Sequence, residues 1–212
     1  MEQSCSKVLR RGTKVATNQN GQQLSAYLLM DCSAQTMLDR IGLIEDALNH
    51  LANRFRQDRV TGSRVNLNVL VMGAATCQKV EPASSGRFQL PGRSHGCDLG
   101  GALQVLTDSL DTPGMRGEGP VEVFVLLASE PAGDWQGRIR ALARKAGITV
   151  FALAPPGVVR DETLRRIQTG NRSYRLDSTS PGVIVNAFQQ VFDILRQSVT
   201  KWLDKEAGGN VS

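Results

Sequence analysis

The sequence predicts an α/β fold: a three-layer, doubly wound and mostly parallel central sheet with one antiparallel edge strand. Short, nearly continuous apolar runs alternate along the chain with amphipathic helical segments, and this alternation indicates a parallel sheet covered on both faces. Three of the apolar runs are followed by short polar loops, as expected where parallel strands end at the binding edge of such a sheet. The 212 residues suit one domain of this class.

Composition supports a globular protein and argues against several other classes. Hydrophobic residues make up 41% of the chain and the net charge is +5, which permits acidic partners without requiring them. The four cysteines show no CxxC spacing, which disfavours a zinc ribbon or a disulfide framework. The polar N-terminus does not resemble a signal peptide, and no run of about 20 apolar residues predicts a membrane span. We therefore expect a cytoplasmic location.

The first half of the chain contains one strongly periodic segment. Apolar residues recur at spacings of three and four over 36–57, which predicts a long helix with one core-facing stripe. The stripe consists of Met37, Ile41, Ile44, Leu48, Leu51 and Phe55. In chain order we expect an N-terminal arm or hairpin over 1–23, a buried strand over 24–30, this helix, a loop over 58–63, a strand over 65–72 and an antiparallel edge strand over 76–80.

The second half repeats the alternation of strand and helix. Leucines at helical spacing predict a helix over 99–110, Gly147 is a plausible helix stop, Asp161 is expected to cap a short helix, and Ser180-Pro181 opens a C-terminal helix. Buried strands are expected over 121–127 and 148–154, helices over 135–146 and 161–168, and a short strand over 173–176. The predicted domain covers 24–206, followed by a disordered tail over 207–212.

Polar side chains gather in three loops that follow predicted strands or precede a helix. They are Asp31-Cys32-Ser33, Gly96-Cys97-Asp98 and Ala128-Ser129-Glu130. Because parallel strands present their carboxyl ends at one edge of the sheet, we expect these loops to meet there. The sequence places the candidate site at this edge.

With these loops in that order, the chain resembles a von Willebrand factor A domain (VWA domain) over about residues 24–203. Within that group it looks closest to bacterial tellurite-resistance TerY-like proteins. The run Gly100-Gly101-Ala102-Leu103, the pair Glu130-Pro131 and the pair Asp134-Trp135 carry this closer similarity. The resemblance implies a Rossmann-like sheet and a metal-ion-dependent adhesion site (MIDAS) formed by the three loops.

The resemblance also implies a ligand set, which this sequence keeps only in part. Asp31 and Ser33 match the first loop, whereas Gln35, Cys97 and Ala128 stand where the family has serine, threonine and aspartate. Magnesium prefers oxygen ligands, and a thiol is a poor one. We therefore expect a degenerate site without metal or other cofactor. If any metal binds, Asp31, Ser33 and Gln35 are the expected ligands.

Other interpretations of the same loops remain open. Cys32, Cys97 and Asp31, with His95, could form a zinc site or a redox pair, because thiol, imidazole and carboxylate are zinc ligands. Cysteine is also often a small buried apolar residue. Asp98 has a complete explanation as a helix N-cap, and Glu130 as a solvated loop residue.

Catalysis and nucleic-acid binding find little support. The chain has no Gly-x-Ser-x-Gly elbow and no phosphate-binding Gly-x-x-x-x-Gly-Lys loop, so we expect no enzyme activity. A basic helix offers a nucleic-acid-associated alternative, but no aromatic residues interleave its charges for base stacking. Its residues are Arg138, Arg140, Arg144 and Lys145, followed later by Arg160, Arg165 and Arg166.

The sequence therefore predicts a protein-interaction or scaffolding module without catalysis. The resemblance implies a partner such as a kinase or phosphatase in a bacterial stress-response system. The lack of a long apolar run predicts no membrane contact. The alternative is a ligand-binding domain that depends on magnesium or zinc. A charge reversal at Glu130 is expected to abolish partner capture and to leave the melting temperature nearly unchanged. The candidate partner-binding face comprises Asp31, Ser33, Gln35, Cys97, Asp98 and Glu130.

Overall fold

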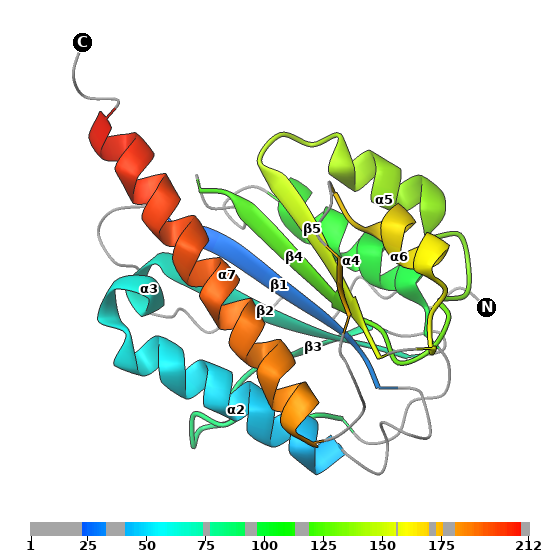
Figure 1. The fold of residues 1–212 in the computed structure, drawn as a ribbon, viewed down its shortest axis with the longest axis horizontal. Helices are drawn as coiled ribbons and strands as arrows, with labels where there is room; N and C mark the ends of the chain where they lie inside the picture. Colours follow the sequence, from blue (N-terminus) through cyan, green and yellow to red (C-terminus); the bar gives the residue numbers. More distant parts are fainter. Residues whose placement is uncertain are drawn as a thin grey trace.

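The fold is that of a computed structural model of the chain. The structure describes residues 23–32, 41–73, 77–91, 97–112, 119–155, 157–169, 173–175 and 181–208. Within these ranges six strands form one sheet in the order β3-β2-β1-β4-β5-β6 (Figure 1). The predicted fold class is confirmed: the sheet is parallel except at one edge, and helices cover both of its faces.

The strands agree with the apolar runs of the sequence. In the middle of the sheet, Leu28 of β1 lies between Val69 of β2 and Phe124 of β4. The short edge strand β3 runs antiparallel to β2, as predicted. The strands are β1 (Leu24–Asp31), β2 (Val65–Met72), β3 (Cys77–Val80), β4 (Val121–Leu126), β5 (Ile148–Ala154) and β6 (Ser173–Arg175).

Two helical layers enclose the sheet, and each has its own apolar core. Alternate residues of β1 serve the two cores: Leu28 belongs to one and Leu29 to the other. Helices α2 (Ile41–Gln57), α3 (Arg59–Arg64) and α7 (Pro181–Gly208) lie on one face, and α4 (Leu99–Asp111), α5 (Gln136–Ala143) and α6 (Asp161–Ile167) lie on the other (Figure 1).

The segment predicted as a loop over 58–63 is mostly the short helix α3. Asp58 caps this helix, because its carboxylate accepts a hydrogen bond from the Thr61 N–H at 3.1 Å. Gly62 lies so close to α2 that a Cβ atom there would sit 1.9 Å from the Phe55 carbonyl oxygen. The glycine that suggested a loop is therefore required by close helix packing.

The C-terminal helix differs from its prediction at its end. Helix α7 continues to Gly208, so the tail predicted over 207–212 begins inside the helix. Residues 1–22 and 209–212 lie outside the described residues. The N-terminal arm predicted over 1–23 therefore lies almost entirely outside them, as does the rest of the predicted tail. Among the described helices, none is both long and apolar enough to cross a membrane.

The strand order changes direction between β1 and β4. From β1 the chain builds outward through β2 and β3, and α4 then carries it back to β4 on the other side of β1. At such a switch point the loops after the two strands diverge, which leaves room for binding at the carboxyl ends. Asp31 ends β1 there, and Ala128 follows β4 by two residues.

Candidate functional site

The three predicted loops do meet at the carboxyl edge of the sheet. The Asp98 N–H donates to the carbonyl of Gly73, just after β2, at 3.0 Å. The Ala132 N–H donates to the carbonyl of Cys97 at 3.2 Å, and Asp98 and Ala132 form a parallel bridge. Backbone hydrogen bonds therefore fix the second and third loops to each other, and the second loop to β2.

Asp31 lies at the centre of this arrangement and is completely buried. Its Oδ2 atom accepts hydrogen bonds from the Ala128 N–H at 3.1 Å and from the Ser129 hydroxyl at 2.8 Å. The thiol of Cys97 donates to the same carboxylate. A buried carboxylate needs such donors, because burial removes its water. Asp31 thus holds the first, second and third loops together.

Ser129 is the site residue that the sequence interpretation missed. The resemblance to the VWA family points to Ala128, where the family has an aspartate, and not to the neighbouring Ser129. Yet the Ser129 hydroxyl donates to Asp31 directly. A hydroxyl next to a lost ligand was the signal in the sequence that could have identified it.

The two cysteines of the site occupy different layers of the molecule. Cys32 packs into the core beneath α2 and α7, whereas Cys97 packs into the core beneath α4 and α5. Burial, with nearby carboxylates adding to it, raises the pKa of Cys32 to about 12 and raises that of Cys97 as well. The two thiols lie in opposite layers, and together with Asp31 and Asp98 they do not form a group arranged to hold a metal ion, so the described residues do not support the alternative of a zinc site.

The described part of the site also does not fit magnesium. Asp31 Oδ2 already accepts two hydrogen bonds, Ala128 carries no ligand atom, and Cys97 is a protonated thiol. Over the described ranges, no group of three or more His, Cys, Asp and Glu side chains is arranged to hold a metal ion. Ser33, Gln35 and His95 lie outside the described residues.

Asp98 has the capping role expected for it. Its Oδ1 atom accepts the Gly101 N–H at 2.8 Å, at the start of α4. A Cβ atom on Gly101 would lie 2.4 Å from Asp98 Oδ2, so the glycine leaves room for the cap. Asp98 is half-buried and lies at the margin of the edge.

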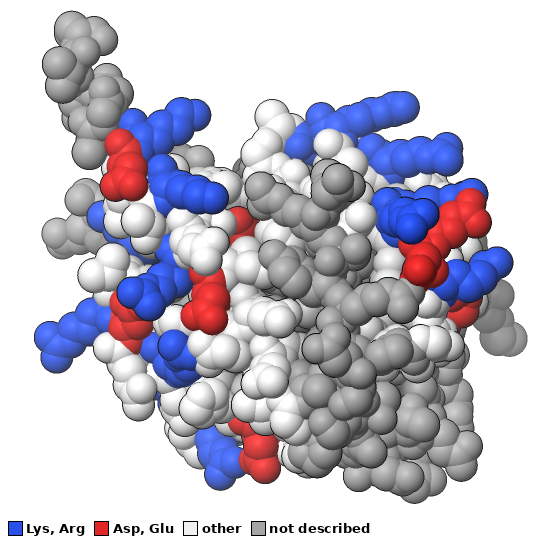
Figure 2. Space-filling model, viewed as in Figure 1, with Lys and Arg blue, Asp and Glu red and all other residues white. Residues whose placement is uncertain are grey.

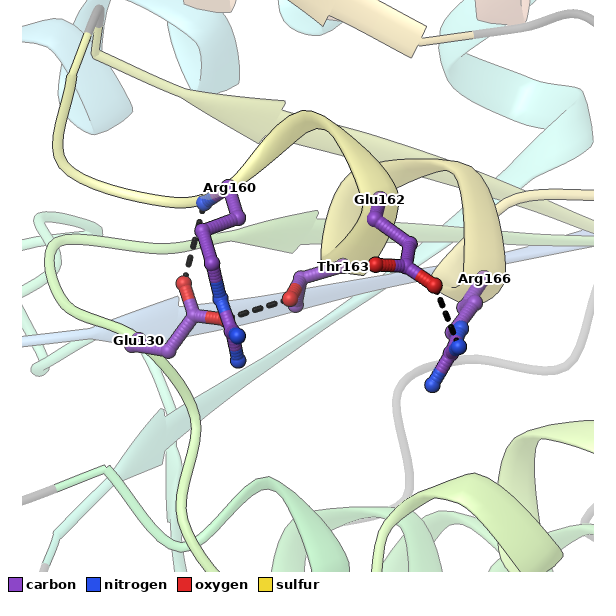
Figure 3. Close-up of polar contacts among 5 residues, drawn as sticks. All are labelled: Glu130, Arg160, Glu162, Thr163 and Arg166. Carbon is purple, nitrogen blue, oxygen red and sulfur yellow. Dashed lines mark hydrogen bonds and ion pairs between the residues drawn. The ribbon is translucent and has the colours of Figure 1, made fainter.

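Glu130 is not a free loop carboxylate. It accepts hydrogen bonds from the Arg160 N–H at 3.0 Å, from Arg160 Nε at 2.9 Å and from the Thr163 hydroxyl (Figure 3). Partial burial raises the pKa of Glu130, but these hydrogen bonds outweigh burial and hold the pKa below its ordinary value. Arg160 is the N-cap of α6 and has no capping bond of its own side chain, so Glu130 caps this helix from the third loop.

These contacts correct three expectations from the sequence. Asp161, expected to cap α6, lies one residue inside the helix, and Glu130 does the capping. A charge reversal at Glu130 would break that cap, so we no longer expect an unchanged melting temperature. Asp31 and Cys97, both expected on the partner-binding face, are buried beneath the loops. Neither side chain is therefore accessible to a partner.

The accessible part of the edge belongs mainly to the third loop. Ala132, Gly133 and Asp134 are exposed, and Gly133 adopts a φ of 80°, which favours glycine. Arg160 is exposed beside Glu130. Their exposure could not be predicted from the sequence, because it depends on what packs against the loop.

A separate hollow is lined by none of the residues at these strand ends. It has a volume of about 440 Å³ and runs between the exposed side of α2 and the segment 81–91. Its lining is polar and consists of Asp46, Asn49, His50, Asn53, Arg56 and Arg87. Asn49 holds its two walls together, since it exchanges hydrogen bonds with the N–H and carbonyl of Phe88. The hollow therefore is not part of the candidate site.

Comparisons with known proteins agree with the fold. No protein-family model matches the chain, and no curated protein matches its sequence. Among solved structures, proximal thread matrix protein 1 from the mussel byssus superposes with a TM-score of 0.63 at 14% identity, covering 81% of this chain and 48% of that one. The chain thus spans about half the length of the mussel protein. Another structure of that protein is described with a zinc-occupied MIDAS motif.

Two further neighbours are named for the domain itself. A von Willebrand factor type A protein from Catenulispora acidiphila matches with a TM-score of 0.56 at 12% identity, covering 81% of this chain and 42% of that one. The SpRpn10 VWA domain matches with a TM-score of 0.53 at 12% identity, covering 80% of this chain and 95% of that domain. At these identities the likeness establishes a VWA-like fold and nothing more specific.

Proposed function

We propose that the chain is a non-enzymatic protein-interaction module that binds a partner at the carboxyl edge of its sheet. The observation that carries this proposal is the environment of Asp31. Its carboxylate is fully buried and accepts hydrogen bonds from the third loop, where a metal-binding domain would direct a carboxylate to a cation. Asp31 keeps the three loops in place, and the loops remain as a binding surface.

The proposed contact surface is the exposed third loop together with its neighbours. Ala132 and Asp134 are exposed at its tip, and Arg160 is exposed beside Glu130. The proposed surface also includes Asp98 and Glu130, which are half-buried at its margin. It includes Ser33 and Gln35 as well, which lie outside the described residues. Because hydrogen bonds hold the third loop to Cys97 and Asp31, a partner would meet a preorganised surface.

The resemblance to TerY-like proteins suggests the kind of partner. We propose a protein of a bacterial stress-response system, with a kinase or a phosphatase as the first candidate. The VWA-like fold of the chain supports the more general part of this proposal, an interaction module. The TerY-like residue pattern alone supports the finer part.

A photo-crosslinking residue placed at Ala132 tests the surface. Ala132 is exposed and contributes only backbone hydrogen bonds, so its replacement should leave the fold intact. The matched control is Val60 on α3, which is 61% exposed. Helix α3 directly precedes β2 and so lies at the amino end of that strand, opposite the carboxyl edge. We expect one dominant crosslinked protein from cells at position 132, none at position 60, and loss of its co-purification with Ala132→Arg. Equal crosslinking at both positions would place the interface elsewhere.

Thermal melting of the metal-stripped protein tests the altered metal site separately. A cation that binds only the folded state at about 100 times its Kd adds about 2.7 kcal/mol of stability. We expect no upward shift with magnesium, manganese or zinc in excess. A shift with magnesium or manganese would instead support a metal-dependent domain that uses Asp31, Ser33 and Gln35. A shift with zinc alone would point to the cysteines.

A further inference from the structure

Helix α5 and its flanks carry cations without acidic residues. Between Trp135 and Val159 the sequence contains no Asp or Glu, and its four charged residues are Arg138, Arg140, Arg144 and Lys145. Figure 2 shows Lys and Arg side chains gathered at the upper right, over α5 and α6. A solvated helix face usually mixes both signs of charge. The charge pattern of α5 is therefore unusual for a helix that only covers a sheet.

The structure separates the compensated cations of this region from the uncompensated ones. Lys145 pairs with Asp111 of α4, and Arg160 pairs with Glu130. Arg166 pairs with Glu162, one turn earlier in α6 (Figure 3). These three charges are already balanced within the fold, so they add little net positive charge to this region.

Of the other four cations, Arg138 is half-buried and donates a hydrogen bond to the neutral Gln104. The remaining three are exposed, namely Arg140 of α5, Arg144 at the C-cap of α5 and Arg165 of α6. Within the described parts of the chain, none of the three forms an ion pair. We call this group the α5–α6 arginine surface. Arg140 lies in the last turn of α5 and Arg144 at its C-cap, so the helix dipole stabilises both cations without neutralising either of them.

The geometry of α5 places these side chains on an accessible side. Arg138 donates a hydrogen bond to Gln104 and Lys145 pairs with Asp111, so that side of α5 faces α4. Arg140 comes two residues after Arg138 and therefore lies nearly opposite it around the helix. Arg144 follows Arg140 by one turn on the same side. Helix α6 packs against α5, and it carries Arg165.

We propose that the α5–α6 arginine surface binds an acidic peptide segment of a protein partner, with carboxylates about one helical turn apart. A guanidinium group binds a carboxylate through two parallel hydrogen bonds, and two such groups one turn apart match that spacing. This surface lies on a helical layer rather than at the carboxyl edge. It is thus independent of the function proposed above.

The neighbourhood of the surface favours a peptide over nucleic acid. Neither α5 nor α6 exposes an aromatic side chain for base stacking, and the adjacent Trp135 is buried. A nucleic-acid surface usually gathers more uncompensated charge than three arginines. A short acidic segment needs only a narrow strip of charge.

Fluorescence anisotropy with a labelled, alanine-rich helical peptide that carries glutamates one turn apart tests the proposal. The test variant is Arg140→Glu/Arg144→Glu. The control is Lys201→Glu/Lys205→Glu, two exposed lysines one turn apart on α7, which changes the net charge equally. Because hydrogen bonds to charged groups are strong, we expect the test variant to lose at least about 10-fold in affinity and the control to stay within about twofold. The Arg140→Lys/Arg144→Lys variant should lie between wild type and the test variant.

Three outcomes would overturn the proposal. Equal losses in both reversed variants would mean that binding follows net charge only. Failure of the wild-type protein to bind the peptide at low salt would mean that the α5–α6 arginine surface does not bind acidic peptides. Stronger binding of a single-stranded DNA oligonucleotide than of the peptide would assign the surface to nucleic acid. Circular dichroism of each variant, with Arg140→Gln/Arg144→Gln as a milder substitution, separates a lost contact from a lost fold.

Discussion

The carboxylates of Asp31 and Glu130 have structural roles that differ from the roles expected from the sequence. Both were candidates for contact with a metal or a partner. In the structure each accepts hydrogen bonds from groups distant in sequence: Asp31 from Ala128 and Ser129, and Glu130 from Arg160 and Thr163. At the residue scale, the site is therefore defined by which donors reach each carboxylate.

We predict that Glu130→Gln lowers the free energy of unfolding by about 1 kcal/mol at pH 7, because it weakens charge-assisted bonds on a partly exposed group. The folded-state pKa of Glu130 lies below its unfolded value. Its contribution is thus complete above the unfolded pKa and disappears as pH falls through the folded pKa. Chemical denaturation of both proteins between neutral and acidic pH should show the difference shrinking in acid.

Glu162→Gln provides the matched control for this prediction. Glu162 belongs to the same helix and pairs with Arg166 one turn away, but the pair is exposed (Figure 3). Removing such a surface pair changes stability by about 0.5 kcal/mol or less. If Glu162→Gln proves as costly as Glu130→Gln, the special capping role of Glu130 is incorrect.

The start of α4 shows how an element depends on a side chain and a glycine together. Asp98 caps the helix, and its carboxylate occupies the space in which a Cβ atom of residue 101 would lie. Glycine is a poor helix residue, yet here it allows the capping bond to form. Helix α3 also needs a glycine, but for a different reason, since Gly62 lies directly against the Phe55 carbonyl of α2.

We predict that Asp98→Ala costs about 1 kcal/mol, as usual for the loss of an N-cap. Gly101→Ala alone should be nearly neutral, because a gain of up to about 1 kcal/mol in helix propensity is offset by displacement of the Asp98 carboxylate. Added to Asp98→Ala, the same substitution should recover up to about 1 kcal/mol. Urea denaturation of the four proteins measures this coupling, and simple additivity of the two effects would contradict it.

At the scale of the whole molecule, one sheet serves two cores. The rings of Phe124 and Phe151 stack within the sheet with centroids 4.8 Å apart, on the face that α2 and α7 cover. Helix α7 packs Phe192 against Phe55 of α2, and the guanidinium of Arg54 lies 4.1 Å from the centre of the Phe192 ring. Helix α7 thus closes one of the two cores.

We predict that Phe192→Ala lowers the free energy of unfolding by about 3–5 kcal/mol, the range for deletion of a buried aromatic ring. Phe192 is 2% exposed, so its truncation leaves a cavity between α7 and α2. Val185→Ala on the same helix, at a residue 40% exposed, should change stability by less than about 0.5 kcal/mol. Equal effects of the two substitutions, measured by chemical denaturation, would mean that α7 does not close this core.

The sequence by itself determined the fold class, the buried strands and the meeting of three polar loops at one edge. These features follow from local patterns: a strand buried on both faces is a short, nearly continuous apolar run, and the apolar stripe of α2 repeats every three or four residues. The capping role of Asp98 was also legible, because an N-cap bonds to a residue only three positions away.

Only the tertiary structure decided what the site residues contact. The bond from Ala128 to Asp31 joins residues 97 positions apart, and Glu130 meets its partners 30 and 33 positions later. Cys32 follows Asp31 directly, yet it packs in the opposite layer from Cys97. Burial and hydrogen-bond partners depend on how distant loops approach one another, and no local pattern of residue types encodes that approach.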